Sequence, residues 1–265
     1  MGAESLGKDA TQMPGLLDPY LKLGRAKVHL DALDVELEKF IGKGKAYALD
    51  RYDDLANQRH VLRFKLNDVP DPPSLIVGDA LYCMRSALDQ LVWSLAKLTV
   101  TIPAHTQFPI FDGPLDNPDS IGRFESQTRG VPDAAVAEIK AFQPYHGAAS
   151  YKAHPLWRLN AMCNLDKHRR IPANGGEILV HLPQGMTKLA TIENLDDCLI
   201  VSIPIAHKDK LQLDPRITVT VNFGGGDPAI DPDALVENRD GLWEIYNFVG
   251  DKVLPRFVRF FGNAA

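Results

Sequence analysis

Apolar residues recur at helical spacing in two long segments ahead of Thr101. From Pro19 to Ile41 they fall every three or four positions, which predicts an amphipathic helix that Gly42 and Gly44 end. Ser74 is suited to cap a second helix. The apolar positions are Leu23, Ala26, Leu30, Leu33, Leu37, Phe40 and Ile41 in the first segment, and Val77, Leu81, Met84, Leu88, Leu91, Val92 and Leu95 in the second.

Other parts of the chain alternate with a period of two, which is typical of strands. In "HVLRFKLN" the residues Leu62, Phe64 and Leu66 share one side, and the earlier "KAYALDRYDD" can pair with this run across "DLANQ" as a hairpin. In the second half, short β-branched runs are separated by turn residues: "EILVHLP", "LATIEN", "CLIVSIPIA" and "RITVTVNF". They predict an antiparallel sheet between residues 177 and 223, closed by "GGGDP".

Turn residues and helix caps divide the rest of the chain. Prolines and glycines are dense from residue 101 to 132, which predicts a long connection with a short helix at 121–127. Asp133 should cap a helix through Phe142, and a further helix should run from 155 to 168 and end before a turn at 174–176. Asp233 should cap a last helix, kinked at Pro255.

These elements predict the α+β class. We expect one domain over residues 16–265, with a helical core of about four main helices and an antiparallel sheet from the second half that covers one side. Residues 1–15 are predicted to be a flexible N-terminal tail.

Composition, charge and motifs exclude several classes of protein and indicate the cellular compartment. The formal net charge of −5 argues against nonspecific coating of nucleic acid, although a local basic patch stays open. Cys83, Cys163 and Cys198 are far apart, so neither a disulfide framework nor a cysteine zinc site is indicated, and we expect a reducing cytoplasm. There is no secretory signal and no stretch of membrane-spanning length. Histidine spacing predicts no metal site, and no phosphate-binding P-loop or serine nucleophile elbow is present, so no cofactor is expected.

Charge is concentrated at the end of "HPLWRLNAMCNLDKHRR", residues 154–170. On a helix, Asn164, Lys167 and His168 fall along a polar stripe beside the apolar stripe of Leu156, Leu159, Met162 and Cys163. Asp166 lies on the flank of the apolar stripe, so we expect it to be mostly buried and to accept hydrogen bonds from Arg85, Arg169 or backbone amides, with Arg170 the nearest cation. The alternative is that basic residues simply favour a helix C-terminus.

Arg85 and Asp89 border an otherwise apolar helix one turn apart. They can form an intrahelical ion pair with a purely structural role. Alternatively, they meet the helix of residues 155–168, where charges on the two helices would compensate one another. The second reading predicts a polar pocket of Arg85, Asp89, Asn164, Asp166, Lys167, His168 and Arg169.

The segments "GDALYCMRSALDQLVWSLA", "FPIF", "FQPYH" and "HPLWRLNAMCNLDKHR" resemble a widespread family of uncharacterised bacterial and phage-borne proteins. That family shares the patterns Arg-Ser-Ala-Leu-Asp-His, Phe-Pro-Ile, Gln-Pro-Tyr and Asp-Lys-His-Arg, and the match covers roughly residues 74–172. The resemblance implies no established activity, so it serves to locate residues.

An Arg followed after four residues by a His on an amphipathic helix is similar to the signature of the HEPN ribonucleases. That resemblance implies a helical dimer that brings Arg and His to a scissile phosphate without a metal, and it allows a homodimer here. Gln90 stands where the motif has His; it can bind a phosphate or a base but cannot titrate. His168 or His154 would then have to move the proton.

Three hypotheses on function follow. The first is a cytoplasmic binding or effector protein whose pocket takes a phosphate-bearing ligand, RNA or a nucleotide included, through Asp89, Gln90, Asn164, Asp166, Lys167 and Arg169. The second is a metal-independent ribonuclease with Arg85 and His168 as catalytic residues. The third treats the charged cluster as structural and places function on a surface for a protein partner. A nuclease needs a titratable His facing Arg85 across an open cleft, a binding protein needs only the cleft, and the structural hypothesis predicts a closed ion-pair network.

Overall fold

A computed structural model describes residues 14–42, 44–147, 150–182, 184–195, 197–211, 216–224 and 238–262 of the 265-residue chain. The predicted Asp233 cap, most of "GGGDP" and residues 1–13 lie outside this range. The first helix already begins at Pro14, so the predicted tail of residues 1–15 is wrong for its last two residues.

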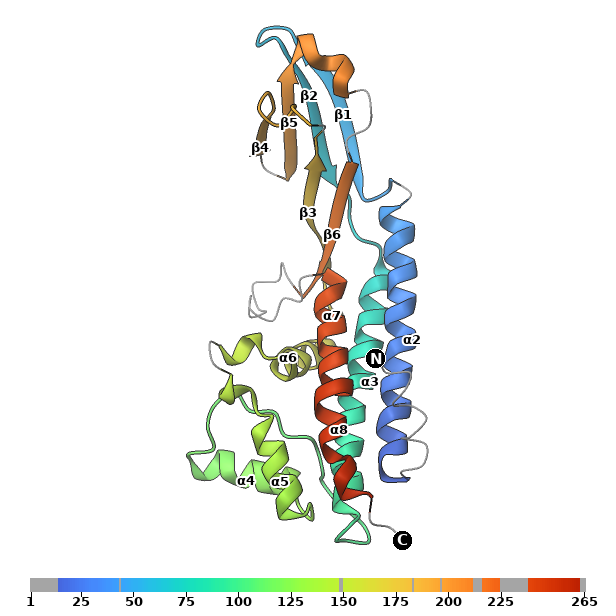
Figure 1. Ribbon diagram of the computed structural model, residues 1–265, viewed down its shortest axis with the longest axis vertical. Coiled ribbons are helices and arrows are strands. Elements are labelled where there is room, and N and C mark those ends of the chain that lie inside the picture. The colour runs from blue at the N-terminus through green and yellow to red at the C-terminus, as the bar shows by residue number, and fades with distance from the viewer. Residues whose placement is uncertain are drawn as a thin grey trace.

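Long helices form the lower part of an elongated molecule (Figure 1). Helices α2 (Pro14–Ile41) and α3 (Asp71–Ala96) run side by side with a C-terminal rod made of α7 (Asn238–Asn247), a π-helical segment (Phe248–Val253) and α8 (Leu254–Phe257). The predicted stripe of α2 from Leu23 to Phe40 is buried, as is that of α3. Pro255 is the second residue of α8, so the π-helical segment fills the turn that precedes it, as expected for a residue that disturbs the preceding turn of a helix.

Shorter helices attach to this core. They are α4 (Pro118–Gln127), α5 (Asp133–Ala141), α6 (Pro155–His168) and short 3₁₀ turns at Pro144–His146, Tyr151–Ala153, Ile205–Leu211 and Val258–Phe260. The predicted bounds of α6 are confirmed. Within the described ranges, no helix combines the length and the apolar composition needed to span a bilayer.

Three local predictions about caps and turns are wrong. Ser74 is buried inside α3, because Pro70 takes the N-cap position and prolines fill the first turn, where a missing N–H costs nothing. Asp133 is the first residue of α5 rather than its cap. The expected turn at residues 174–176 belongs to a strand, where a bulge falls between Gly175 and Ile178.

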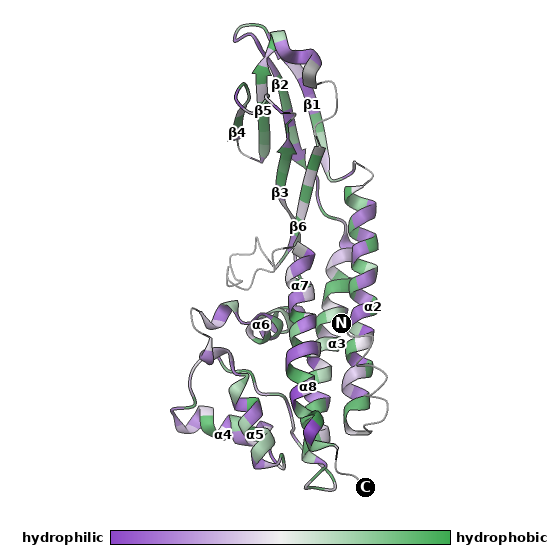
Figure 2. Cartoon of the chain, viewed as in Figure 1, coloured by the Kyte–Doolittle hydropathy of each residue, from purple (hydrophilic) through white to green (hydrophobic). Residues whose placement is uncertain are grey.

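The main sheet stands beyond one end of the helices (Figure 1). Its antiparallel order is β1 (Tyr47–Asp54), β2 (Arg59–Leu66), β5 (Cys198–Pro204) and β4 (Thr191–Leu195). A two-stranded ribbon of β3 (Ala173–His181) and β6 (Arg216–Phe223) connects this sheet to the helices. Strand β5 is predominantly hydrophobic in Figure 2, whereas hydrophobic and paler positions alternate along β6.

The α+β class is confirmed, but the sheet differs from expectation. The predicted hairpin forms, and its strand β2 pairs along its length with β5, so the sheet joins both halves of the chain. It does not cover a side of the helices; it has a small apolar core of its own, made of Leu62, Phe64, Met186, Val201 and Ile203.

Candidate functional site

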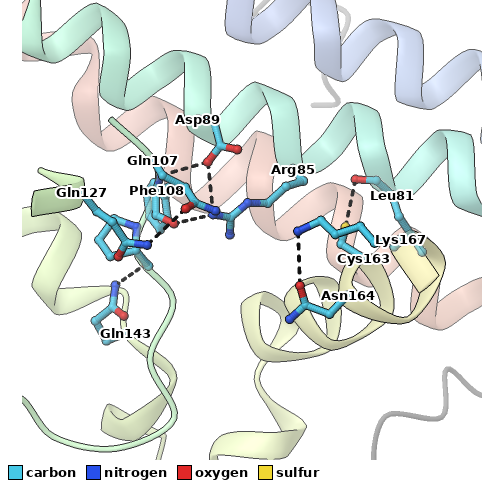
Figure 3. A network of polar contacts seen from close by, with 11 residues as sticks. Leu81, Arg85, Asp89, Gln107, Phe108, Gln127, Gln143, Cys163, Asn164 and Lys167 are labelled. Carbon is cyan, nitrogen blue, oxygen red and sulfur yellow. Dashed lines mark hydrogen bonds and ion pairs between the residues drawn. The ribbon is translucent and has the colours of Figure 1, made fainter. Parts of the chain in front are cut away.

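Arg85 and Asp89 form the predicted intrahelical ion pair, and together they hold a peptide of the long connection. The Arg85 Nη2 atom lies 3.2 Å from Asp89 Oδ1 and donates a 2.7 Å hydrogen bond to the carbonyl of Phe108. The Phe108 N–H donates back to Asp89 Oδ1 at 2.9 Å (Figure 3). Burial raises the pKa of the Asp89 carboxyl, and the Arg85 charge opposes this effect. The pair therefore satisfies both polar groups of one loop residue.

Gln143 holds the same segment from the other side. Its side chain is only 1% exposed, its Oε1 accepts from the Phe111 N–H at 2.9 Å, and its Nε2 donates to the carbonyls of Pro109 and Ile139 at 2.9 and 3.0 Å. The Gln107 N–H also donates to the carbonyl of Gln127. Residues 107–111 are thus fixed by two side chains of α3 and by that of Gln143, the second residue beyond α5. These contacts join three of the patterns named above: Arg-Ser-Ala-Leu-Asp, Phe-Pro-Ile and Gln-Pro-Tyr.

A pocket of about 200 Å³ lies between α3 and α6, beside this fixed segment. One terminal nitrogen of Arg85, Nη1, is buried and has no hydrogen-bond partner among the described residues. Figure 3 shows this nitrogen on the side of the guanidinium that faces away from Asp89, with no dashed line to it. A buried cationic donor without a protein partner is costly, so either an ordered water or a bound group is expected at this nitrogen. The residues that line the pocket are Tyr82, Arg85, Ser86, Asp89, Gln107, Cys163, Asp166 and Lys167.

The pocket brings together part of the predicted set. Arg85, Asp89, Asp166 and Lys167 line it, so α3 and α6 do meet through their charged residues. Tyr82, Ser86, Gln107 and Cys163 also line it and were not predicted. Tyr82 and Ser86 precede Arg85 and Asp89 by three residues each, so helical spacing would have found them, whereas nothing local in the sequence indicates that Gln107 folds back onto α3.

The other predicted residues do not line the pocket. Gln90 donates weakly to Ser86 Oγ at 3.4 Å, and its own Oε1 is buried without a partner among the described residues. Asn164 accepts a 3.3 Å hydrogen bond from Lys167 Nζ (Figure 3). His168 is exposed at the last position of α6, and Arg169 follows it as the C-cap residue.

The expectation that Asp166 is mostly buried and hydrogen-bonded is wrong. Its side chain is exposed, and no donor within the described part of the chain reaches it. Its carboxylate lies over Gly78, where a Cβ would be only 2.7 Å from Oδ1, so the glycine allows α6 to approach α3. Partial burial and the nearby Asp79 raise the pKa of Asp166. Arg170, the expected cation, pairs with Asp71 instead, at 2.6 Å.

Replacing Asp166 by alanine should therefore change the free energy of unfolding by less than about 0.5 kcal/mol, as for ordinary surface positions. No donor is left unpaired by the change, and repulsion from Asp79 is relieved. Urea denaturation followed by circular dichroism measures this. A loss of about 2 kcal/mol or more would instead indicate the buried partner that the sequence suggested.

The pocket holds charge and hydrogen-bonding groups, but no histidine lines it. His154 caps the start of α6, where its Nδ1 accepts from the Leu156 N–H at 3.2 Å, and burial lowers its pKa. Burial raises the pKa of the Cys163 thiol to about 12, and this thiol faces the carbonyl of Leu81 at 3.6 Å. Cys163 is therefore protonated near neutral pH and is no nucleophile.

No group of three or more His, Cys, Asp or Glu side chains in the described ranges is arranged to hold a metal ion. Comparison with protein-family models, with curated proteins and with solved structures finds no match to the chain. The resemblance to the HEPN superfamily therefore stays a prediction.

Proposed function

We propose that this protein binds a small phosphate-bearing ligand in the pocket between α3 and α6. The observation that carries the proposal is the unpaired Nη1 of Arg85. Asp89 and the Phe108 carbonyl hold the other side of the same guanidinium, so Nη1 is already oriented before a ligand arrives. A guanidinium presents planar donors that suit phosphate oxygens, and little entropy is lost when its geometry is preset.

The remaining lining residues support a small anionic ligand. Lys167 adds a second cation from α6, and Tyr82, Ser86 and Gln107 add neutral hydrogen-bonding groups. The pocket volume of about 200 Å³ is below the roughly 300–1,000 Å³ usual for sites of drug-sized ligands, which favours a compact metabolite. The buried thiols of Cys83, Cys163 and Cys198 are unpaired, which supports the proposed cytoplasmic location.

The ribonuclease hypothesis has less support from this geometry. Its proposed acid and base, His168, is not among the residues that line the pocket, and Gln90 is not either. The hypothesis of a purely structural cluster accounts for Asp89 and for one side of Arg85, but it gives Nη1 no protein partner among the described residues. The homodimer also stays a prediction.

Ethyl phosphate should bind to the protein, and Lys167→Ala should weaken binding about tenfold or more, because a charge-assisted hydrogen bond contributes about 1.5–3 kcal/mol. Arg85→Lys keeps the charge but loses the planar donors, so it should weaken binding as well. Isothermal titration calorimetry measures both, after circular dichroism has shown that each variant is folded.

Lys188→Ala serves as the control, since Lys188 is an exposed lysine outside the pocket. Equal affinity of wild type and Lys167→Ala would contradict the proposal. A short 5′-phosphorylated RNA forms a separate arm: cleavage that is lost in His168→Ala would favour the ribonuclease hypothesis instead.

A further inference from the structure

One end of the pocket carries negative charge that the described chain does not compensate. Asp166 lines the pocket over Gly78, and Asp79, the next residue of α3, is close enough to raise the pKa of Asp166 by repulsion. In the described ranges neither carboxylate takes part in an ion pair or hydrogen bond. Since like charges held side by side repel, this end of the pocket favours a cation.

The pocket therefore contains both positive and negative side chains. Arg85 and Lys167 lower the pKa of the Cys163 thiol, whereas Asp166 and Asp89 raise it, so all four charges lie around this thiol. Asp89 is already engaged by Arg85 and by the Phe108 N–H. The groups left for a ligand are therefore the Arg85 Nη1 atom, the Lys167 ammonium and the Asp166 carboxylate.

We propose that the ligand is a small zwitterion, a phosphate ester that also carries an ammonium group, with the phosphate at Arg85 and Lys167 and the ammonium at Asp166. This inference rests on the proposed function and names its ligand class. An ester without an amino group would bring its negative charge close to Asp166 and gain nothing from it. A metal ion at the same place would need more ligands than Asp166 and Asp79, and no cluster in the described ranges supplies them.

Ethyl phosphate and phosphoethanolamine test the inference because they differ essentially in the amino group. Phosphoethanolamine should bind wild type at least about tenfold more tightly, as expected for one added charge-assisted hydrogen bond. In Asp166→Asn this preference should fall to less than about twofold, because the neutral amide no longer attracts the ammonium or repels the phosphate. Asp119→Asn, which changes an exposed carboxylate in the first turn of α4, should keep the full preference.

The outcomes separate the two proposals. If ethyl phosphate binds in a Lys167-dependent way and phosphoethanolamine binds no better, the zwitterion inference is overturned and the proposed function stands. If neither compound binds, both are overturned. A preference that persists in Asp166→Asn also overturns the assignment of the ammonium to Asp166. Glycerophosphoethanolamine carries the same ammonium group but a phosphodiester with a single negative charge, whereas the monoester of phosphoethanolamine carries about −1.5 to −2 near neutral pH. The relative affinity of the two compounds therefore distinguishes a lipid headgroup from a free monoester as the source.

Discussion

Replacing Asp89 by alanine is expected to lower the free energy of unfolding by about 2–3 kcal/mol. The change leaves the buried Arg85 cation without its carboxylate and a loop amide without its acceptor. Arg85 is 9% exposed and depends on Asp89 for its only carboxylate partner in the described chain. The Phe108 N–H loses its acceptor in the same step. Asp89→Asn should cost less, since its amide oxygen still accepts from Phe108.

Urea denaturation of the wild type and both variants measures these differences. The matched control is Lys39→Ala, which breaks an exposed ion pair on α2 between Lys39 and Glu36 at 2.7 Å. Exposed pairs of this kind contribute about 0–1 kcal/mol, so the control should lie near the wild type. If Asp89→Ala is as mild as Lys39→Ala, then the Arg85–Asp89 pair does not stabilise the loop.

Gln143→Ala should be about as severe, with an expected loss of roughly 3 kcal/mol. The truncation leaves the Phe111 N–H and the Pro109 carbonyl without their partner, and it opens a cavity at a side chain that is 1% exposed. The exposed Gln184 provides the control, and its alanine variant should stay within about 0.5 kcal/mol of wild type.

A double variant of Asp89 and Gln143 tests whether both residues hold one segment. Each residue holds the segment 107–111, so loss of one should reduce the free energy of unfolding that the other contributes. The combined loss should then be smaller than the sum by about 0.5 kcal/mol or more, as for residues that share a structural element. Strict additivity would show that the two anchors act independently.

These results would divide the motif residues by role. Asp89 and Gln143 contact the fixed segment and have a structural explanation that requires no ligand. Lys167 and Asp166 line the pocket from α6, and both are exposed. Arg85 belongs to both groups, because one terminal nitrogen binds the loop and the other is unpaired. Ligand affinity and stability should therefore respond to different substitutions.

The amino-acid sequence by itself determined the elements whose burial follows a simple period. Helix α6 was predicted with its observed bounds, and the buried stripes of α2 and α3 were found from apolar spacing. The hairpin of β1 and β2 also followed from alternation across a short turn. In these segments neighbours along the chain decide which side chains are buried, so a local pattern contains the answer.

Only the tertiary structure decided which elements meet and which polar groups remain unpaired. Helical spacing placed Asp166 beside an apolar stripe, but Gly78 lets its carboxylate lie over α3 at the edge of solvent. The pairing of β2 with β5 and the return of Phe108 to Arg85 join residues that are distant in sequence. The partners in the second case are backbone groups, which every residue carries and no residue pattern distinguishes. For that reason the sequence could indicate charged helices, whereas the pocket and its unpaired Arg85 nitrogen required the folded chain.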